Sequence, residues 1–336
     1  VDNNSTVLIN KHKNNDIIAI SIIAKGGEFV EKAVGEGTLV ASTMLKGTQK
    51  YSSQELAQIM EENGIKIQPA CSEDCFSIGV QTTVSQMDLT LELLDEILNN
   101  AVFDDYEIEK MRAEILNKIK QKRDIPMNIA LEEFKTLIFE NGVYSHSNKI
   151  LEKNLPKVTS ANVKNYYNKI FDSKNVIISV NGNFNNEQII NAFGSILKDK
   201  KQPAFNYSNY KVTKLTEPKI FSKTLKDLQS AWLFLGWQTG KINEVKDFVT
   251  LKVIDTILGG GMSSRLFRNL REQDGLAYQL GSSYVPRVLG GTFMTYIGTS
   301  PETLNYSKEK IKNEVDINKV CKTLKEYHKN IVEELK

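Results

Sequence analysis

The stretch "GEGTLVASTMLKGTQKYSS", residues 35–53, decides the fold of this chain and raises the question of its function. Its part "TLVASTML" consists of small and apolar residues, which predicts a short buried helix. After a turn, Ser52 opens a second helix, because Glu55 lies three residues further on and completes a capping box. The first helix offers nothing more reactive than hydroxyl groups, and Ser42 has no histidine nearby to activate it. The order of helix, turn and second helix is typical of a helix that carries reactive groups. The side chains of the first helix instead predict that it serves for packing.

Composition excludes several classes of function. The 336 residues are 40% apolar and 25% charged, as in a globular protein of about two domains. A net charge of +2 gives no reason to expect a nucleic-acid partner, and no apolar run approaches the ~20 residues of a membrane span. Cys71, Cys75 and Cys321 form no CxxC pair, and the three histidines are far apart, so we expect no metal site in this chain. The start at Val1 fits a cleaved signal peptide without showing one.

Periodicity predicts further elements of secondary structure. Alternating residues predict a strand over 76–84, and helical spacing predicts helices over 85–100 and 105–122. Pro301, in a first turn that follows Ser300 as a cap, predicts a helix late in the chain.

One order of elements occurs twice: strand, buried helix, glycine turn, second helix and strand. Residues 44–56 and 257–267 occupy the same place in it. This weak repeat predicts an α+β fold of two related lobes, over residues 1–200 and 218–336. Residues 201–217 lose periodicity and are predicted to be a linker. The second lobe is the shorter and is expected to be incomplete.

Arg271 and Tyr278 are the first candidates for a functional site. Arg271 falls near the end of a predicted helix that Gly275 terminates, and Tyr278 begins the next strand. Such a corner can direct both side chains into one space, where their donors would hold a peptide carbonyl or an oxyanion. From spacing alone we favour the simpler alternative, in which Arg271 pairs with Glu272 or Asp274 and the tyrosine packs inside the lobe.

The second candidate is the turn "GGGMSSR". Gly259, Gly260 and Gly261 would let a ligand or another backbone approach closely. No lysine follows in the phosphate-loop pattern, so that function is excluded. A tight turn between helices and a substrate loop are equally good interpretations.

The acidic residues of the predicted helix 105–122 are a weaker candidate for acid–base chemistry. Glu107, Glu109 and Glu114 alternate with Lys110, Arg112 and Lys118, which predicts a solvated, salt-bridged face.

Several segments also resemble one known family. "ILGGGMSSRLFRNLREQDGLAYQLGSSY" (257–284) resembles the second lobe of the M16 zinc peptidases, which include pitrilysin, insulinase and the mitochondrial processing peptidase. "MLKGTQKYSSQELAQIMEENG" (44–64) resembles the segment after the family's metal-binding helix, and "AVFDDYEIEKMRAEILNKI" (101–119) resembles the helix of its third ligand. The likeness runs from about residue 5 to about residue 315. It implies two α/β-sandwich lobes of the LuxS/MPP-like type, the second of them incomplete.

The resemblance also implies that the metal site is degenerate. Active members carry His-x-x-Glu-His, in which two histidines and a distant glutamate bind zinc while the motif glutamate activates water. The histidine positions correspond here to Thr38 and Ser42, the base to Ala41, and the distant ligand to Lys118 or a residue near it. We therefore expect no metal in this chain and no peptidase activity from it alone.

One further feature of the resemblance is an arginine and a tyrosine that lie seven residues apart. In the family such a pair, on a noncatalytic lobe, holds the substrate backbone beside the zinc, and Arg271 and Tyr278 match it. Gly259–Gly261 resembles a short form of the glycine-rich loop of the noncatalytic subunit of the processing peptidase. The implied protein is a noncatalytic M16B-type subunit that binds peptide substrate in a heterodimer with a catalytic M16 subunit. The partner would supply His-x-x-Glu-His and Zn²⁺, and a periplasmic location is favoured over a cytoplasmic one.

Two alternatives stay open. The chain is also compatible with the C-terminal half of a single-chain pitrilysin-type peptidase, and with a non-enzymatic M16-like scaffold or core protein, in which the pair would have no function.

Overall fold

The chain forms two compact units, each built from two separate segments. The computed structural model describes residues 4–13, 15–225, 228–277, 279–316 and 320. Unit 1 comprises Val1–Ile119 with Asn148–Tyr207, and unit 2 comprises Lys120–Ser147 with Ser208–Lys336. Unit 2 therefore includes a segment, Lys120–Ser147, that the sequence-based division assigned to the first lobe.

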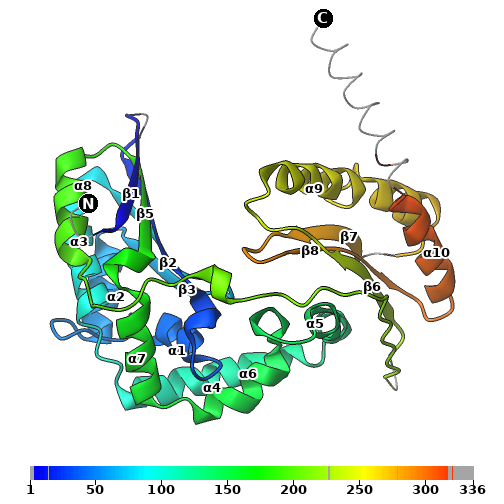
Figure 1. Ribbon diagram of the computed structural model, residues 1–336, viewed down its shortest axis with the longest axis horizontal. Coiled ribbons are helices and arrows are strands. Elements are labelled where there is room, and N and C mark those ends of the chain that lie inside the picture. Colours follow the sequence, from blue (N-terminus) through cyan, green and yellow to red (C-terminus); the bar gives the residue numbers. More distant parts are fainter. Residues whose placement is uncertain (1–3, 14, 226–227, 278, 317–319, 321–336) are drawn as a thin grey trace, which may run out of the picture. The chain divides into compact units, whose positions relative to one another are not determined.

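Unit 1 is a mixed sheet with helices packed on it (Figure 1). Its strands, among the described residues, have the order β1-β5-β2-β4-β3, with β1 parallel to β5 and the other pairs antiparallel. These strands are β1 (Thr6–Lys11), β2 (Ile17–Lys25), β3 (Lys66–Cys71), β4 (Cys75–Thr83) and β5 (Val176–Gly182). Every second residue of β2 is buried, namely Ile18, Ile20, Ile22 and Ala24, so this strand supplies one face of the core.

The helices of unit 1 begin where the sequence provides a cap. In α2, Ser52 accepts from the Glu55 amide at 3.2 Å and Glu55 accepts from the Ser52 amide at 2.8 Å, which confirms the predicted capping box. The same motif opens α7 at Thr159 and Asn162. The helices of this unit are α1 (Glu36–Thr43), α2 (Ser53–Glu62), α3 (Met87–Asn99), α4 (Asp105–Lys122), α6 (Asn148–Asn154), α7 (Ser160–Ile170) and α8 (Asn186–Ile196). The last three residues of α4 are grouped with unit 2.

Unit 2 is built on a smaller antiparallel sheet, whose described strands have the order β6-β8-β7. Leu258, Leu266, Leu270 and Ile297 are among the buried residues of its own core. The elements are α5 (Pro126–Phe139), β6 (Ala231–Gln238), α9 (Val245–Leu258), a π-helix (Phe267–Gln273), β7 (Gln279–Val285), β8 (Thr292–Thr299) and α10 (Leu304–Glu314).

The segment that carries α5 joins unit 2 because it packs on β6. The Phe134 ring lies 5.9 Å from the Phe234 ring, and a Cβ at Gly236 would come within 2.4 Å of Phe134. Gln238 adds a hydrogen bond to the Ile138 carbonyl at 2.8 Å. These contacts join residues about 100 positions apart, so local sequence patterns do not predict them.

The predicted fold class, α+β with helices packed on sheets, is confirmed. The late helix begins at Leu304 after Thr303, so the start predicted at Ser300 and Pro301 was wrong by one turn. The reason is a hydroxyl cluster: Thr303 Oγ1 lies 2.6 Å from Thr299 Oγ1 and 3.0 Å from Ser300 Oγ, which holds these residues in a turn. In the described part of the chain, no helix has both the length and the apolar character to cross a membrane.

Candidate functional site

The helix α1 contains three of the positions that the resemblance assigns to the degenerate metal motif, and a half-buried acid, Glu31, holds its N-terminus. The Glu31 carboxylate accepts the amides of Gly35, at 3.0 Å, and Gly37, at 2.8 Å. Burial raises the pKa of Glu31 to about 8, although both hydrogen bonds favour the charged form. The sequence analysis did not identify Glu31. The pattern that could have indicated it is an acidic residue four and six positions before Gly35 and Gly37, at the start of a helix.

The first turn of α1 is packed too closely for a side chain at Gly37. A Cβ there would lie 2.3 Å from Cys71 Sγ and 2.9 Å from the Tyr166 hydroxyl. Tyr166 donates to the Gly27 carbonyl at 3.0 Å, which fixes its ring beside the helix. Burial raises the pKa of the Cys71 thiol, which disfavours the reactive thiolate form.

The three positions on α1 that the resemblance assigns to the metal motif, Thr38, Ala41 and Ser42, offer no zinc ligand. The Ser42 hydroxyl donates to the Thr38 carbonyl at 2.6 Å, within the helix itself. Ala41 packs against the core, and Lys118 is an exposed cation on α4. Zinc prefers thiolate, imidazole and carboxylate ligands, so the residues present do not fit it. Across the described residues, no three His, Cys, Asp or Glu side chains gather into a possible metal site.

The acidic face of α4 is only partly the solvated surface that the sequence predicts. Glu109 is exposed, but its partner Arg112 is buried, 3.0 Å away. The Arg112 guanidinium also donates to the carbonyls of Leu155 and, at 2.7 Å, Val158. Arg112 thus ties α4 to the segment before α7, a structural function rather than acid–base chemistry.

Arg271 lies in unit 2, exposed, on the π-helix. Its guanidinium carbon is 4.6 Å from the centroid of the Phe267 ring, which is a cation–π contact. Asp274, one of the two partners favoured from spacing, instead pairs with Lys310 at 2.9 Å. π-Helical turns are frequent at functional sites. Tyr278 lies outside the described residues, so the structure does not define the geometry of the pair.

The three glycines of the turn after α9, Gly259–Gly261, differ in how much space surrounds them. A Cβ at Gly259 would lie 2.0 Å from the Ser282 backbone nitrogen, so glycine is required where α9 meets β7. At Gly260 it would lie 2.8 Å from Thr256 Cα, whereas at Gly261 nothing lies within 4 Å. Packing accounts for Gly259, and Gly261 is the open position of the turn.

Family models cover most of the chain. Residues 6–147 match "Insulinase (Peptidase family M16)", and residues 157–334 match "Peptidase M16 inactive domain". The second match alone spans more than half of the sequence.

Individual relatives agree with these matches. An uncharacterized zinc protease of Rickettsia felis is 26% identical over 315 residues, covering 93% of this chain and 76% of that protein. The non-peptidase homolog YmxG of Helicobacter pylori is 23% identical, over 87% of this chain and 68% of its own length. The fold also matches the crystal structure of a peptidase M16 inactive domain from Pseudomonas fluorescens, with a TM-score of 0.81 and 20% identity, over 93% of this chain and 76% of that one. The chain therefore belongs to peptidase family M16, and its type is that of the noncatalytic members.

Proposed function

We propose that this protein is the noncatalytic, substrate-binding subunit of a heterodimeric M16 zinc peptidase. In this proposal a separate catalytic M16 subunit supplies His-x-x-Glu-His and zinc. This chain contributes Arg271 and Tyr278, whose donors hold the backbone of an unfolded peptide and the oxyanion that forms during its hydrolysis.

The observation that carries the proposal is the state of α1. This helix keeps the packing of a functional element: Glu31 holds its N-terminus and Tyr166 lies against it. Yet the positions that the resemblance assigns to the metal ligands and the base are Thr38, Ala41 and Ser42, and the Ser42 hydroxyl donates to the Thr38 carbonyl of its own helix. A lobe that keeps its architecture and loses its ligands fits a subunit that works beside an active one.

The environment of Arg271 supports its role in substrate binding. The buried Leu270 and the left-handed Gly275 position the end of the π-helix, and the Leu276 amide closes it on the Leu270 carbonyl at 2.8 Å. The stacking of Arg271 on Phe267 restricts the side chain while its guanidinium donors stay available to a ligand.

The test uses the purified chain, a His-x-x-Glu-His M16 homologue as its partner, and a fluorogenic unfolded peptide. We expect no cleavage by this chain alone and zinc-dependent cleavage by the pair. Arg271→Ala should lower kcat/KM by about 10²–10³-fold, as loss of an oxyanion donor does. Arg268→Ala removes the same charge from an exposed position on the same π-helix and should stay within about twofold of the native pair.

Two results would overturn the proposal. One is robust, chelator-sensitive cleavage by this chain without any partner. The other is undiminished turnover by a pair that contains Arg271→Ala.

A further inference from the structure

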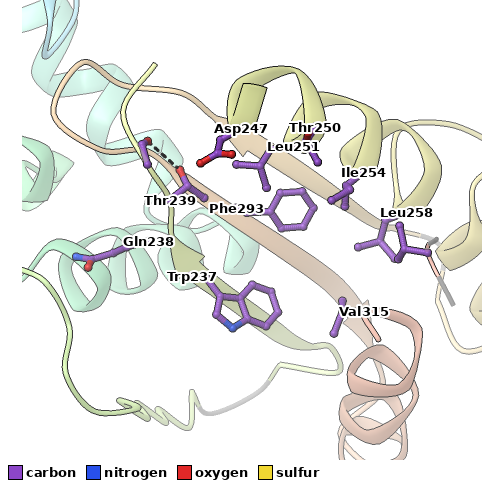
Figure 2. A pocket seen from close by; sticks show the side chains of 12 residues that line it. Trp237, Gln238, Thr239, Asp247, Thr250, Leu251, Ile254, Leu258, Phe293 and Val315 are labelled. Atoms are coloured by element: carbon purple, nitrogen blue, oxygen red, sulfur yellow. Dashed lines mark hydrogen bonds between the residues drawn. The ribbon is translucent and has the colours of Figure 1, made fainter. Parts of the chain in front are cut away.

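Two features of the structure take no part in the proposed substrate site: an apolar groove in unit 2 and a half-buried lysine in unit 1. The groove, with a volume of about 440 Å³, lies between α9, β6 and Phe293 of β8, and Figure 2 shows their side chains directed toward it. Nothing in the described residues shows what covers this groove. The lysine, Lys200, instead has specific contacts, and these favour a reactive amine.

The backbone around Lys200 is fastened to the turn that follows α7. Three interactions join residues 198–202 to residues 172–174. They are the hydrogen bonds from the Ser173 amide to the Lys198 carbonyl (3.1 Å) and from the Gln202 amide to the Asp172 carboxylate (3.1 Å), and the ion pair between Lys174 and Asp199 (2.9 Å). Lys201 has a left-handed backbone, with φ of +56°, and its amide donates to the Asp199 carboxylate at 2.8 Å. The chain therefore turns directly after Lys200, which is held in place from both sides.

The side chain of Lys200 lies over the ring of Tyr167 in α7, with Nζ 4.9 Å from the ring centroid. Tyr167 is buried, and its hydroxyl donates to the Ile97 carbonyl at 2.9 Å. Its ring also packs edge-on against Phe103, at 4.8 Å between centroids. The amine thus lies against an aromatic surface that its own contacts hold in place.

No acid neutralises this amine: among the described residues, Lys200 makes no ion pair. The two acids of the same segment are engaged elsewhere. The Asp172 carboxylate accepts the amides of Lys174, at 3.1 Å, and Gln202, while Asp199 pairs with Lys174. The ammonium form of Lys200 is therefore half-buried without a counter-ion, which disfavours it.

The protonation of Lys200 follows from these contacts. Burial lowers the pKa of Lys200 to about 8, and repulsion from Lys198 acts in the same direction, although Asp172 favours the charged form. Burial raises the pKa of Tyr167, so its phenol stays neutral at pH 8. The charged groups that act on these two side chains are Lys198, Asp172, Asp95 and Glu96.

We propose that Lys200 is a nucleophilic lysine that small acyl phosphates acylate. The neutral Nζ attacks the carbonyl carbon of the acyl phosphate, and an N–C bond forms. The C–O bond to the phosphate breaks, the phosphate leaves with the electron pair, and the nitrogen releases a proton to water. The product is a neutral amide at a place where burial disfavours charge. Lys198, an exposed cation two residues away, favours an anionic acyl donor over a neutral one.

The expected advantage of Lys200 follows from its fraction of neutral amine. At pH 8 about half of Lys200 is neutral, against about 0.4% of a lysine with an ordinary pKa near 10.4. Lower basicity also weakens a nucleophile, by about tenfold over this range if amines follow the dependence known for thiols. The two effects together leave Lys200 about tenfold more reactive than an ordinary lysine.

The test treats the full chain with acetyl phosphate and measures acetylation at each lysine by mass spectrometry. The ratio of the rates at Lys200 and Lys198 should be about tenfold higher in the native protein than in guanidinium chloride, which removes the burial. In the native protein the rate at Lys200 should reach half of its maximum near pH 8 and level off above it. Lys198→Gln should raise this half-maximal pH, because a neighbouring positive charge is lost, whereas Lys201→Gln, at an exposed position, should leave it unchanged.

Three results would overturn the proposal. One is an equal ratio of rates in the native and the unfolded chain. Another is a rate at Lys200 that keeps rising steeply from pH 8 to 10. The third is preferential acetylation of Lys200 by an uncharged acetyl ester but not by acetyl phosphate, which would contradict the choice of acyl donor.

Discussion

Replacing Gly259 by alanine should destabilise unit 2, because the new methyl group has no space between α9 and β7. Its Cβ would lie 2.0 Å from the Ser282 nitrogen and 2.6 Å from the Gly281 carbonyl carbon, both backbone atoms. Ordinary contact begins near 3.4 Å, so the two elements must separate by about 1 Å. That movement strains the bond from Ser282 to Asp255, 2.6 Å long. Overpacking costs about 1–3 kcal/mol and a weakened charge-assisted hydrogen bond about 1.5 kcal/mol more, so we expect a loss of roughly 3 kcal/mol.

Urea unfolding followed by tryptophan fluorescence measures this loss, since Trp232 and Trp237 both report on unit 2. In a thermal scan the same loss should lower Tm by roughly 6–12 °C. Gly261→Ala is the matched control: no atom lies within 4 Å of its Cβ and its φ is not positive, so its stability should change by less than about 1 kcal/mol. Equal stability of the two variants would refute the packing argument. If the turn handles substrate, Gly261→Ala is the variant that should lower kcat/KM.

Two further predictions concern one unit each. Burial raises the pKa of Glu31 from an ordinary 4.5 to about 8, so its contribution to the stability of unit 1 is complete below pH 4.5 and is lost as the pH rises through 8. Urea unfolding followed by far-UV CD from pH 4 to 9 should therefore show a decline in the free energy of unfolding, which Glu31→Gln should flatten. Glu62→Gln, at an exposed position, should leave that decline unchanged. Phe134→Ala should cost unit 2 about 2–3 kcal/mol, measured by tryptophan fluorescence, because the ring packs on Phe234 and over Gly236; a cost below about 0.5 kcal/mol would contradict the docking of α5 on β6.

The elements that sequence analysis predicted well are those with local signals. The helix predicted over 105–122 is α4, with the same bounds, and the strand predicted over 76–84 is β4, shifted by one residue. The capping of α2 at Ser52 likewise depends on residues that are near one another in the sequence. Each of these signals lies within a few residues of the element that it specifies.

The features that sequence analysis missed depend on contacts between distant residues. Nothing near Phe134 indicates that it packs on β6, about 100 residues away, and Arg112 looks like a surface residue until Leu155 and Val158 are placed beside it. For the candidate site, the assignment of Thr38 and Ser42 to lost metal-ligand positions rests on the resemblance and stays a prediction. The hydrogen bond from the Ser42 hydroxyl to the Thr38 carbonyl of its own helix could not be predicted from the sequence, because it depends on the side-chain conformation.

Because unit 2 is built from two separate segments of the chain, its folding during synthesis is delayed. On the ribosome, α5 is complete at Phe139, but the strand that covers it begins at Ala231, roughly 90 residues and on the order of ten seconds later. During that interval residues 148–207 emerge and can close unit 1, while the apolar side of α5 has no strand to pack on. The nascent protein thus exposes the apolar side of α5 for seconds during every round of synthesis. A trigger-factor-like holdase is the kind of factor expected to bind there, and slow translation between Phe139 and Ala231 should favour aggregation.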